Sequence, residues 1–264
     1  MKKTVNILSV DWDYFMSSTN FKREKLYIPD SGEDWSKEER DIMWSSQYAL
    51  HPLLYNERID ENRFNAFKEY LKNHKFQRVI ITDSHKELYD LINNLCNMFY
   101  FNLVNLDFHH DIFDNMNPEI DCGNWLRRLL IKQNDPHNKV LWINHETSDR
   151  NEWKQFNCVK LIQSTNLNRI LKYDFSIMFV CKSEIFSPPH LDKYFQILFN
   201  DYREDVNSYV YINRFEKIEK QIQQRNIEIK KSLSYIKKDM KKNWIQYRLG
   251  GWYNQNIKGE ENGI

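Results

Sequence analysis

The stretch FNLVNLDFHHD, residues 101–111, governs both the fold and the chemistry expected of this chain. Its apolar first half has the pattern of a buried strand, and it ends abruptly in Asp107, His109, His110 and Asp111. Polar and charged groups beside a buried strand cost stability unless a partner compensates them. Residues two apart on an extended chain point the same way, so Asp107, His109 and Asp111 can converge while His110 faces elsewhere. A divalent cation suits such a point of convergence; a solvated strand end is the alternative.

Two other apolar segments end in the same way. Residues 4–10 (TVNILSV) predict a buried strand that leads directly into Asp11 and Asp13. The short β-branched run VIIT, residues 79–82, leads to His85 at a strand-to-helix junction. A loop with two solvated aspartates and a histidine that caps or packs are the alternative readings. The coincidence of three polar strand ends favours one shared site.

The order of the segments predicts an α/β fold in three α-β-α layers. Nearly continuous apolar strands alternate with amphipathic helices, which indicates a mostly parallel sheet covered on both faces. The expected strands span about residues 4–11, 78–82, 101–107, 139–144, 158–163 and 175–181. Ligands bind such sheets outside the carboxyl ends of the strands. Glu184, which follows the last expected strand, is placed at that edge too.

We expect one large domain over residues 1–213, with an insertion at about 17–60 that forms a helix near 37–48 and a wall beside the site. Residues 60–73 predict an amphipathic helix with Asp60 as its N-cap. Residues 214–264 are rich in charge, and a narrow apolar seam predicts a helical extension packed on the domain. Pairing of this seam with a second copy, giving a homo-oligomer, is the alternative.

Composition excludes several classes of function. The 264 residues are 41% hydrophobic and 15% aromatic, enough for a large core, and the net charge of +1 argues against nucleic acid or anionic membrane as partners. The four cysteines show no metal-binding spacing, which favours reduced thiols in the cytoplasm. The short apolar run at the N-terminus meets Asp11 too early for a signal peptide, and no segment reaches membrane-spanning length.

Together the strand ends offer six candidate metal ligands: Asp11, Asp13, His85, Asp107, His109 and Asp111. Six are too many for one tetrahedral zinc but suit two ions that share carboxylates. Mixed oxygen and imidazole ligands without thiolate favour Mn²⁺ or Fe²⁺ over structural zinc. A two-metal site can hold a bridging hydroxide at neutral pH, and that hydroxide can attack an amide, a guanidinium or a phosphoryl centre.

Two of these segments resemble motifs of the ureohydrolases, the arginase and agmatinase superfamily. Residues 107–111 (DFHHD) resemble the DxHxD motif, residues 9–13 (SVDWD) the SxDxD motif, and His85 the histidine ligand that precedes DxHxD. In arginases SxDxD follows DxHxD, whereas here it comes first. This order is similar to that of a divergent arginase-like family that includes peptide arginases. The resemblance covers about residues 5–190.

The resemblance implies an arginase-like fold, two Mn²⁺ ions per chain and a role for each ligand. Asp11 and Asp107 would bridge the ions. His85 and Asp111 would complete one site, and Asp13 and His109 the other. The implied reaction is hydrolysis of the guanidino group of arginine, within a peptide, to ornithine and urea.

The resemblance also implies substrate-binding and proton-transfer residues. Glu184 is similar in placement to the family glutamate that pairs with the guanidinium, and Asn124 lies in a loop that binds the amino-acid end of the substrate. Leu126 stands where the family has a histidine that carries protons. Other histidines then become candidates for that catalytic role: His110, His145 and His190.

Two other functions fit parts of the sequence. A haloacid-dehalogenase-like phosphatase also begins with a strand followed by DxD, but it expects Thr or Val where Phe15 stands. A non-catalytic protein that binds metal or peptide on the same fold is the second alternative. This alternative stays open because Leu126 stands where the family has its proton-carrying histidine.

Overall fold

The structure is a computed structural model that describes residues 2–17, 36–114, 118–151, 153, 160–200, 202, 218–224, 226–228 and 231. The chain divides into two compact units, Met1–Ile222 and Gln223–Ile264. The first unit holds the sheet and every candidate site residue. It extends past residue 213, where the sequence predicted the domain boundary.

Six strands of the first unit form one sheet in which every pair is parallel, in the order β2-β6-β1-β3-β4-β5. The strands are β1 (Lys3–Asp11), β2 (Arg78–Thr82), β3 (Phe99–Asp107), β4 (Lys139–Asn144), β5 (Lys160–Ser164) and β6 (Ile177–Cys181). The predicted α/β class, the parallel sheet and all six strands are therefore confirmed, with ends shifted by a few residues.

The register brings the polar ends of neighbouring strands together. Asp11, the last residue of β1, pairs with Cys181 at the end of β6, and Cys181 also pairs with Thr82 at the end of β2. On the other side of β1, Val10 pairs with Leu106, so Asp107 ends β3 at nearly the same height. The carboxyl edge of the central strands therefore carries the candidate ligands.

Helices and short 3-10 segments connect the strands. The helices are α2 (Lys37–Leu50), α3 (Glu61–Asn73), α4 (Glu87–Leu95), α5 (Trp125–Lys132) and α7 (Asp192–Phe199). The 3-10 segments are η1 (Trp12–Phe15), η3 (Pro52–Asn56), η4 (Leu167–Lys172) and η5 (Pro189–Leu191). Local sequence sets two helix starts: Ser36 and Glu39 form a capping box on α2, and Asp60 caps α3 as predicted.

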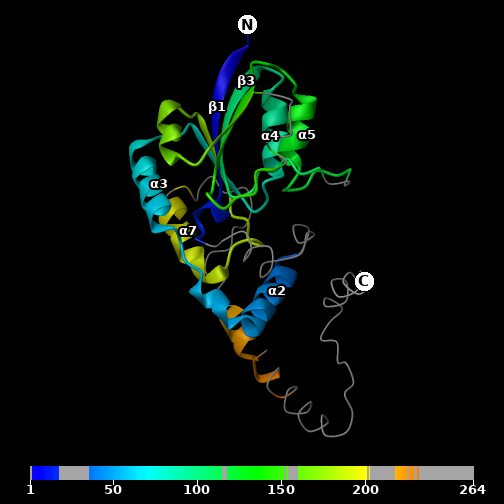
Figure 1. Cartoon of the computed structure of the whole chain (residues 1–264), viewed down its shortest axis with the longest axis vertical. Helices are drawn as coiled ribbons and strands as arrows, with labels where there is room; N and C mark the ends of the chain where they lie inside the picture. Colours follow the sequence, from blue (N-terminus) through cyan, green and yellow to red (C-terminus); the bar gives the residue numbers. More distant parts are fainter. Residues whose placement is uncertain are drawn as a thin grey trace, which may run out of the picture. The chain divides into compact units, whose positions relative to one another are not determined.

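Side chains alternate along each strand between two cores, one on each face of the sheet. Leu8 and Val10 of β1 face the core that α3 and α7 cover, whereas Ile7 faces the core that α4 and α5 cover. Figure 1 shows α3 and α7 on one side of β1 and β3, and α4 and α5 on the other. By this alternation Ser9, Asp11, Asn105 and Asp107 lie on the α4–α5 side.

The predicted insertion is closed at its base by backbone pairing. Met16 and Ile59 form an antiparallel bridge, and the amide of Ser17 donates to the carbonyl of Arg58 at 2.9 Å. Within the insertion, α2 extends from 37 to 50, which confirms the predicted helix. A third apolar cluster joins α2 and η3 to the loop after β6 and to residues 218–222; it consists of Met43, Trp44, Tyr48, Leu54, Ile185, Ile218 and Ile222.

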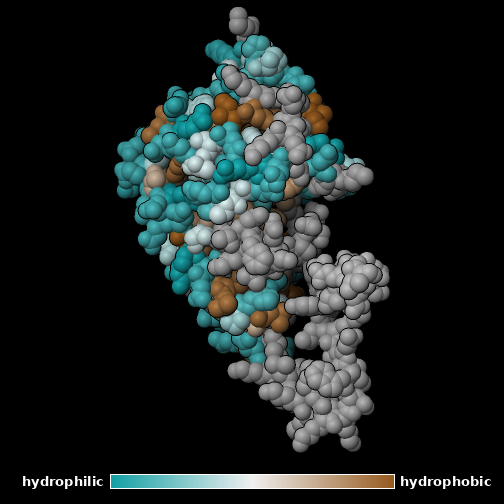
Figure 2. Space-filling model, viewed as in Figure 1, coloured by the Kyte–Doolittle hydropathy of each residue, from teal (hydrophilic) through white to brown (hydrophobic). Residues whose placement is uncertain are grey.

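The described part of the tail, residues 218–224, 226–228 and 231, is helical. Most of the predicted extension lies outside the described residues. None of the helices within the described ranges is both long and apolar enough to span a bilayer. Figure 2 shows a mostly hydrophilic face with scattered hydrophobic patches, and the exposed apolar side chains include Ile42 and Leu53.

Candidate metal centre

His85 is the centre of the site that the strand ends form. It lies between β2 and α4 and is buried. Nδ1 of its ring faces one carboxylate oxygen from each of three aspartates. The distances are 3.3 Å to Asp11 Oδ2, 3.2 Å to Asp107 Oδ2 and 3.2 Å to Asp111 Oδ2. Three segments far apart in the sequence therefore meet around one nitrogen.

These distances match the spacing of ligands around a metal ion. Oxygen and nitrogen ligands at about 2.1 Å from one ion lie about 3.0–3.4 Å apart when adjacent in an octahedral or tetrahedral shell. Nδ1 of His85 has no hydrogen-bond partner of acceptable geometry among the described residues. The ring nitrogen thus points into a group of carboxylates without bonding directly to any of them, and a cation fits this arrangement.

The other ring nitrogen of His85 is held by a serine. Nε2 lies 2.6 Å from Oγ of Ser9 on β1. The ring also stacks on Phe179 of β6 at 5.9 Å between centroids and contacts Trp125 of α5 at 5.1 Å. A histidine that binds a metal normally donates its second N–H to a fixed acceptor, and the hydroxyl of Ser9 lies where such an acceptor would be.

Each carboxylate of the His85 group has its own hydrogen-bond donor. Asp11 Oδ2 accepts from the hydroxyl of Ser183 at 2.7 Å. Asp107 Oδ2 accepts from the side-chain amide of Asn105 at 3.1 Å, and Asp111 Oδ2 accepts from the indole N–H of Trp125 at 2.6 Å. Donors of this kind orient carboxylates and limit their movement.

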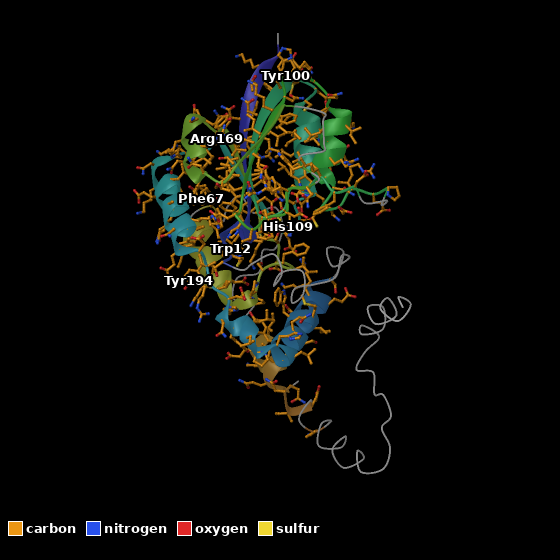
Figure 3. All side chains as sticks on the ribbon, in the orientation of Figure 1. Trp12, Phe67, Tyr100, His109, Arg169 and Tyr194 are labelled. Carbon is orange, nitrogen blue, oxygen red and sulfur yellow. The ribbon has the colours of Figure 1, made fainter. Side chains whose placement is uncertain are left out.

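A second group of ligand atoms lies beside the first and shares Asp107 with it. It consists of Asp13, Asp107 and His109, whose ligand atoms lie within 4.8 Å of one another. Nδ1 of His109 is 3.1 Å from Oδ2 of Asp13. The six predicted ligands therefore lie together in two adjoining groups that share Asp107. The resemblance also implied a bridging position for Asp11, but Asp11 lies beside His85 and is not in the second group. Figure 3 shows His109 at the end of β3 opposite to Tyr100.

His109 forms the open side of the site. Its side chain is 32% exposed, whereas those of Asp13 and His85 are almost completely buried. The ring of Phe186 lies 5.7 Å from that of His109. A molecule that reaches these ligands from solvent would therefore pass His109 first.

The ligands converge by a different route from the predicted one. Strand β3 ends at Asp107 and β1 ends at Asp11, so His109, Asp111 and Asp13 do not lie on extended strands. Asp13 is instead turned inward by η1. Asp111 adopts a left-handed backbone with φ 55°. Strand alternation therefore does not explain how these side chains approach one another, and His109 and Asp111 lie in different groups that share Asp107.

Backbone strain is concentrated at this edge of the sheet. Among the described residues, the non-glycine positions with positive φ are Asp111 and Ser183, at 55° and 48°. Asp111 lies in the His85 group, and Ser183 donates to Asp11. Such conformations cost about 1–3 kcal/mol and are retained where the surroundings require them. Here the requirement is the orientation of two carboxylates.

Burial and mutual repulsion change the protonation of the cluster. Burial raises the pKa of Asp11 to about 7, with further contributions from Asp13 and Asp107. Burial likewise raises the pKa of Asp107 to about 8, and the charge of Asp111 adds to it. Burial alone would lower the pKa of His85, but contacts with Asp107, Asp11 and Asp111 outweigh it and raise this pKa well above its usual range. The carboxylates therefore need positive charge, from a proton or a metal ion.

Glu184 lies in a neighbouring buried network of charges. Its carboxylate accepts from Nζ of Lys182 at 3.0 Å, and Lys182 donates to Asp192 at the same distance. Arg40 of α2 forms an ion pair with Asp83 and lies 3.8 Å from Oε2 of Glu184. The carboxylate predicted to bind a guanidinium thus has an internal guanidinium nearby.

The remaining predicted residues have structural contacts of their own. Asn124 uses its side-chain oxygen to accept from the amide of Asp121 at 3.0 Å and donates to the carbonyl of Glu119 at 2.9 Å. His110 accepts at Nδ1 from the amide of Ile112 and packs on Phe113. Asn124 and His110 are therefore held by their own loops, and His110 is in neither ligand group.

The two other candidate proton carriers differ in their surroundings. His190 lies 2.5 Å from the hydroxyl of Tyr48 at one nitrogen and 3.1 Å from the carbonyl of Glu57 at the other. His145 follows β4 and contacts Thr147 at 2.8 Å, with its ring 5.5 Å from that of Phe108. His145 thus lies against the residue that follows Asp107.

Sequence reasoning assigned no role to the residues that orient the candidate ligands, although Ser9 is part of the motif at residues 9–13. They are Ser9, Asn105, Trp125 and Ser183, together with Cys181 beside Asp11. Ser9 and Asn105 precede Asp11 and Asp107 by two positions on the same strands, so alternation could have placed them on the site face. The parts played by Trp125 and Ser183 depend on tertiary packing and left no signal in the pattern.

Comparison of the chain with models of known protein families found no match, and comparison with curated proteins found no significant relative.

Proposed function

We propose that this protein is a binuclear metal hydrolase that cleaves the guanidino group of arginine within a peptide, yielding ornithine and urea. The observation that carries the proposal is the position of Nδ1 of His85, 3.2–3.3 Å from three carboxylates with which it forms no hydrogen bond of acceptable geometry. A buried cluster of this kind would be unfavourable without a cation. The arginase-like identity of the fold and the reaction rest on the resemblance of residues 9–13 and 107–111.

The donor set fits two divalent ions. His85, Asp111 and Asp11 would hold one ion, Asp13 and His109 the other, and Asp107 would contact both. Carboxylate oxygens and imidazole nitrogens suit Mn²⁺. When bound, such a pair of ions would supply a water of lowered pKa as the nucleophile.

The protein's own residues would bind and orient the substrate. Glu184 would accept two parallel N–H bonds from the guanidinium, a geometry that carboxylates provide well. The substrate would enter beside His109 and Phe186, and α2 would form one wall. Arg40 would then have to move away from Glu184, or both Arg40 and the substrate guanidinium would contact this carboxylate.

A substrate held within a peptide is preferred to free arginine because of Leu126. Leu126 lies in the first turn of α5, and its side chain is fully buried in the core. It offers no polar contact to a free amino acid. His145, which follows β4, is the candidate for proton transfer to the leaving amine. Its ring lies against that of Phe108, the residue that follows Asp107.

The experiment is a substrate screen with the Mn²⁺-loaded full chain. Free arginine, agmatine and a set of arginine-containing peptides are incubated with the protein, and urea and the conversion to ornithine are measured, the latter by mass spectrometry. Asp107→Asn serves as the metal-binding control. Urea released from peptides by the wild type and not by this variant supports the proposal.

Other outcomes would favour the alternatives. Release of phosphate from aryl phosphates, without urea from any guanidino compound, would favour a phosphatase. Two bound ions with no turnover of either class would favour a binding protein on the same fold.

A further inference from the structure

A buried thiol lies beside the His85 half of the metal centre. Cys181 is the last residue of β6 and pairs directly with Asp11. Its side chain is on the same face of the sheet as Ile177 and Phe179, which is the α4–α5 side that also carries Asp11 and Asp107. Cys181 is 1% exposed, so its thiol is removed from solvent.

Its sulfur is within range of the ligand atoms. Sγ of Cys181, a carboxylate oxygen of Asp11 and a ring nitrogen of His85 all lie within 4.8 Å of one another. Two ligands on opposite sides of one ion, with bonds of about 2.3 Å to sulfur and about 2.1 Å to oxygen, lie about 4.4 Å apart. The three atoms are therefore close enough to belong to one metal site.

Ser183 connects the thiol to the carboxylate of Asp11. Its hydroxyl lies 3.2 Å from Sγ of Cys181 and donates to Oδ2 of Asp11 at 2.7 Å. Ser183 keeps this place with a left-handed backbone, φ 48°, which an ordinary surface serine would not need. Independently of the thiol, the buried Nδ1 of His85 lies 3.3 Å from Oδ2 of Asp11 and has no hydrogen-bond partner in the described ranges.

We infer that Cys181 is a further ligand of the ion beside His85 and that it determines which metal this half of the centre prefers. The inference rests on the proposed binuclear centre. On binding, the thiol gives its proton to solvent and the thiolate sulfur bonds to the ion. A thiolate favours Fe²⁺, Co²⁺ or Zn²⁺ over Mn²⁺, whereas Asp13, Asp107 and His109 offer only oxygen and nitrogen.

The test uses Co²⁺ as an optical probe. The metal-free full chain is titrated with Co²⁺ without oxygen, and absorption is recorded in the near ultraviolet, where thiolate-to-cobalt charge transfer occurs, and in the visible. We expect the charge-transfer band in the wild type and its loss in Cys181→Ser, with cobalt still bound. Cys96→Ser is the matched control, because Cys96 is also buried and in no disulfide but belongs to none of the ligand groups, and its band should be unchanged.

Two further measurements test the inference even if the Cys181→Ser variant fails to fold. Replacing Cys96, Cys122 and Cys158 by serine leaves Cys181 as the sole thiol, and this variant should keep the band. X-ray absorption of the zinc-loaded wild type should show sulfur at about 2.3 Å. We also expect Cys181→Ser to lower the preference for Zn²⁺ over Mn²⁺ about tenfold, a size typical of changes around a metal ligand.

The outcomes separate this inference from the proposed function. A wild type that binds two Co²⁺ ions without a thiolate band, and zinc without a sulfur neighbour, overturns the role of Cys181 and leaves the metal centre intact. A wild type that binds no Co²⁺ overturns both.

Discussion

Oγ of Ser9 lies 2.6 Å from Nε2 of His85, and this contact sets which nitrogen of the ring faces the aspartates. If Nε2 carries the proton and donates it to Ser9, Nδ1 keeps its lone pair for a metal ion. Ser9→Ala removes the acceptor. We expect the Mn²⁺ affinity of the site beside His85 to fall about 10–100-fold in this variant, as it does when other residues that orient a metal ligand are replaced. Titration calorimetry on the metal-free protein measures it.

The control for Ser9→Ala is Ser45→Ala. Ser45 is also fully buried, but it donates to the carbonyl of Ile42 within α2. Its replacement should change metal affinity by less than twofold. Equal losses in the two variants would mean that the first acts through general destabilisation.

Neighbouring histidines provide a second test, because His109 and His110 differ in the structure. Nδ1 of His109 faces Asp13, whereas His110 packs on Phe113 and accepts from the backbone. We predict that His109→Ala binds one ion fewer than the wild type and that His110→Ala binds both. Elemental analysis of the purified variants measures the difference.

His110→Ala should instead lose thermal stability, because it removes a buried ring. Truncation of a large buried side chain typically costs about 2–5 kcal/mol. A loss of metal in His110→Ala at full stability would contradict the assignment.

Much of the fold could be predicted because apolar runs and helix caps are local. The run at 101–107 and the Asp60 cap before α3 depend on nearby residues only. The polar ends of three strands also indicated the six candidate ligands, since a parallel sheet brings its carboxyl ends to one edge.

The details of the site depend on contacts that no local pattern contains. Asp111 reaches His85 through a left-handed backbone and a hydrogen bond from Trp125, fourteen positions later in the sequence. Glu184 was identified at the sheet edge, but its proximity to Arg40 requires the placement of α2. The sequence allowed us to name candidate ligands but not to predict the residues that hold them in place.

The raised pKa values predict how pH affects the metal-free protein. Asp11 and Asp107 have folded pKa values of about 7 and about 8, above the usual 3.8, and His85 is raised above 6.5. Between about pH 4 and pH 8 the folded chain therefore binds more protons than the unfolded chain, so the free energy of unfolding falls as pH rises.

Metal should reverse this dependence. Ligands must lose their protons to bind an ion, so added Mn²⁺ should stabilise the protein more at pH 8 than at pH 6. Thermal unfolding at several pH values, with and without Mn²⁺, measures both effects. Asp107→Asn should weaken both the pH dependence of the metal-free protein and the stabilisation by Mn²⁺. A metal-free wild type that becomes more stable between pH 6 and pH 8 would contradict the protonation scheme.

Glu184 is predicted to act on the substrate and not on the metal. Glu184→Gln removes the charge that would pair with the guanidinium. Hydrogen bonds to charged groups contribute about 1.5–3 kcal/mol, so kcat/KM for an arginine peptide should fall about 10–100-fold. The metal content should be unchanged.

Asp192→Asn is the matched control for Glu184→Gln. Asp192 also contacts Lys182, so its replacement disturbs the same buried network without removing Glu184. Its kcat/KM should stay within a few-fold of the wild type. A similar fall in both variants would place the effect in the network around Lys182.

The central claim is that Asp107 belongs to two adjoining metal sites. Elemental analysis of the metal-free chain, reloaded with Mn²⁺ and freed of excess metal, tests it most directly in the wild type and in Asp107→Asn. We predict two equivalents of Mn²⁺ per wild-type chain and fewer than one in the variant, because both sites lose a ligand. No bound metal in the wild type, or two equivalents retained by Asp107→Asn, would contradict the claim.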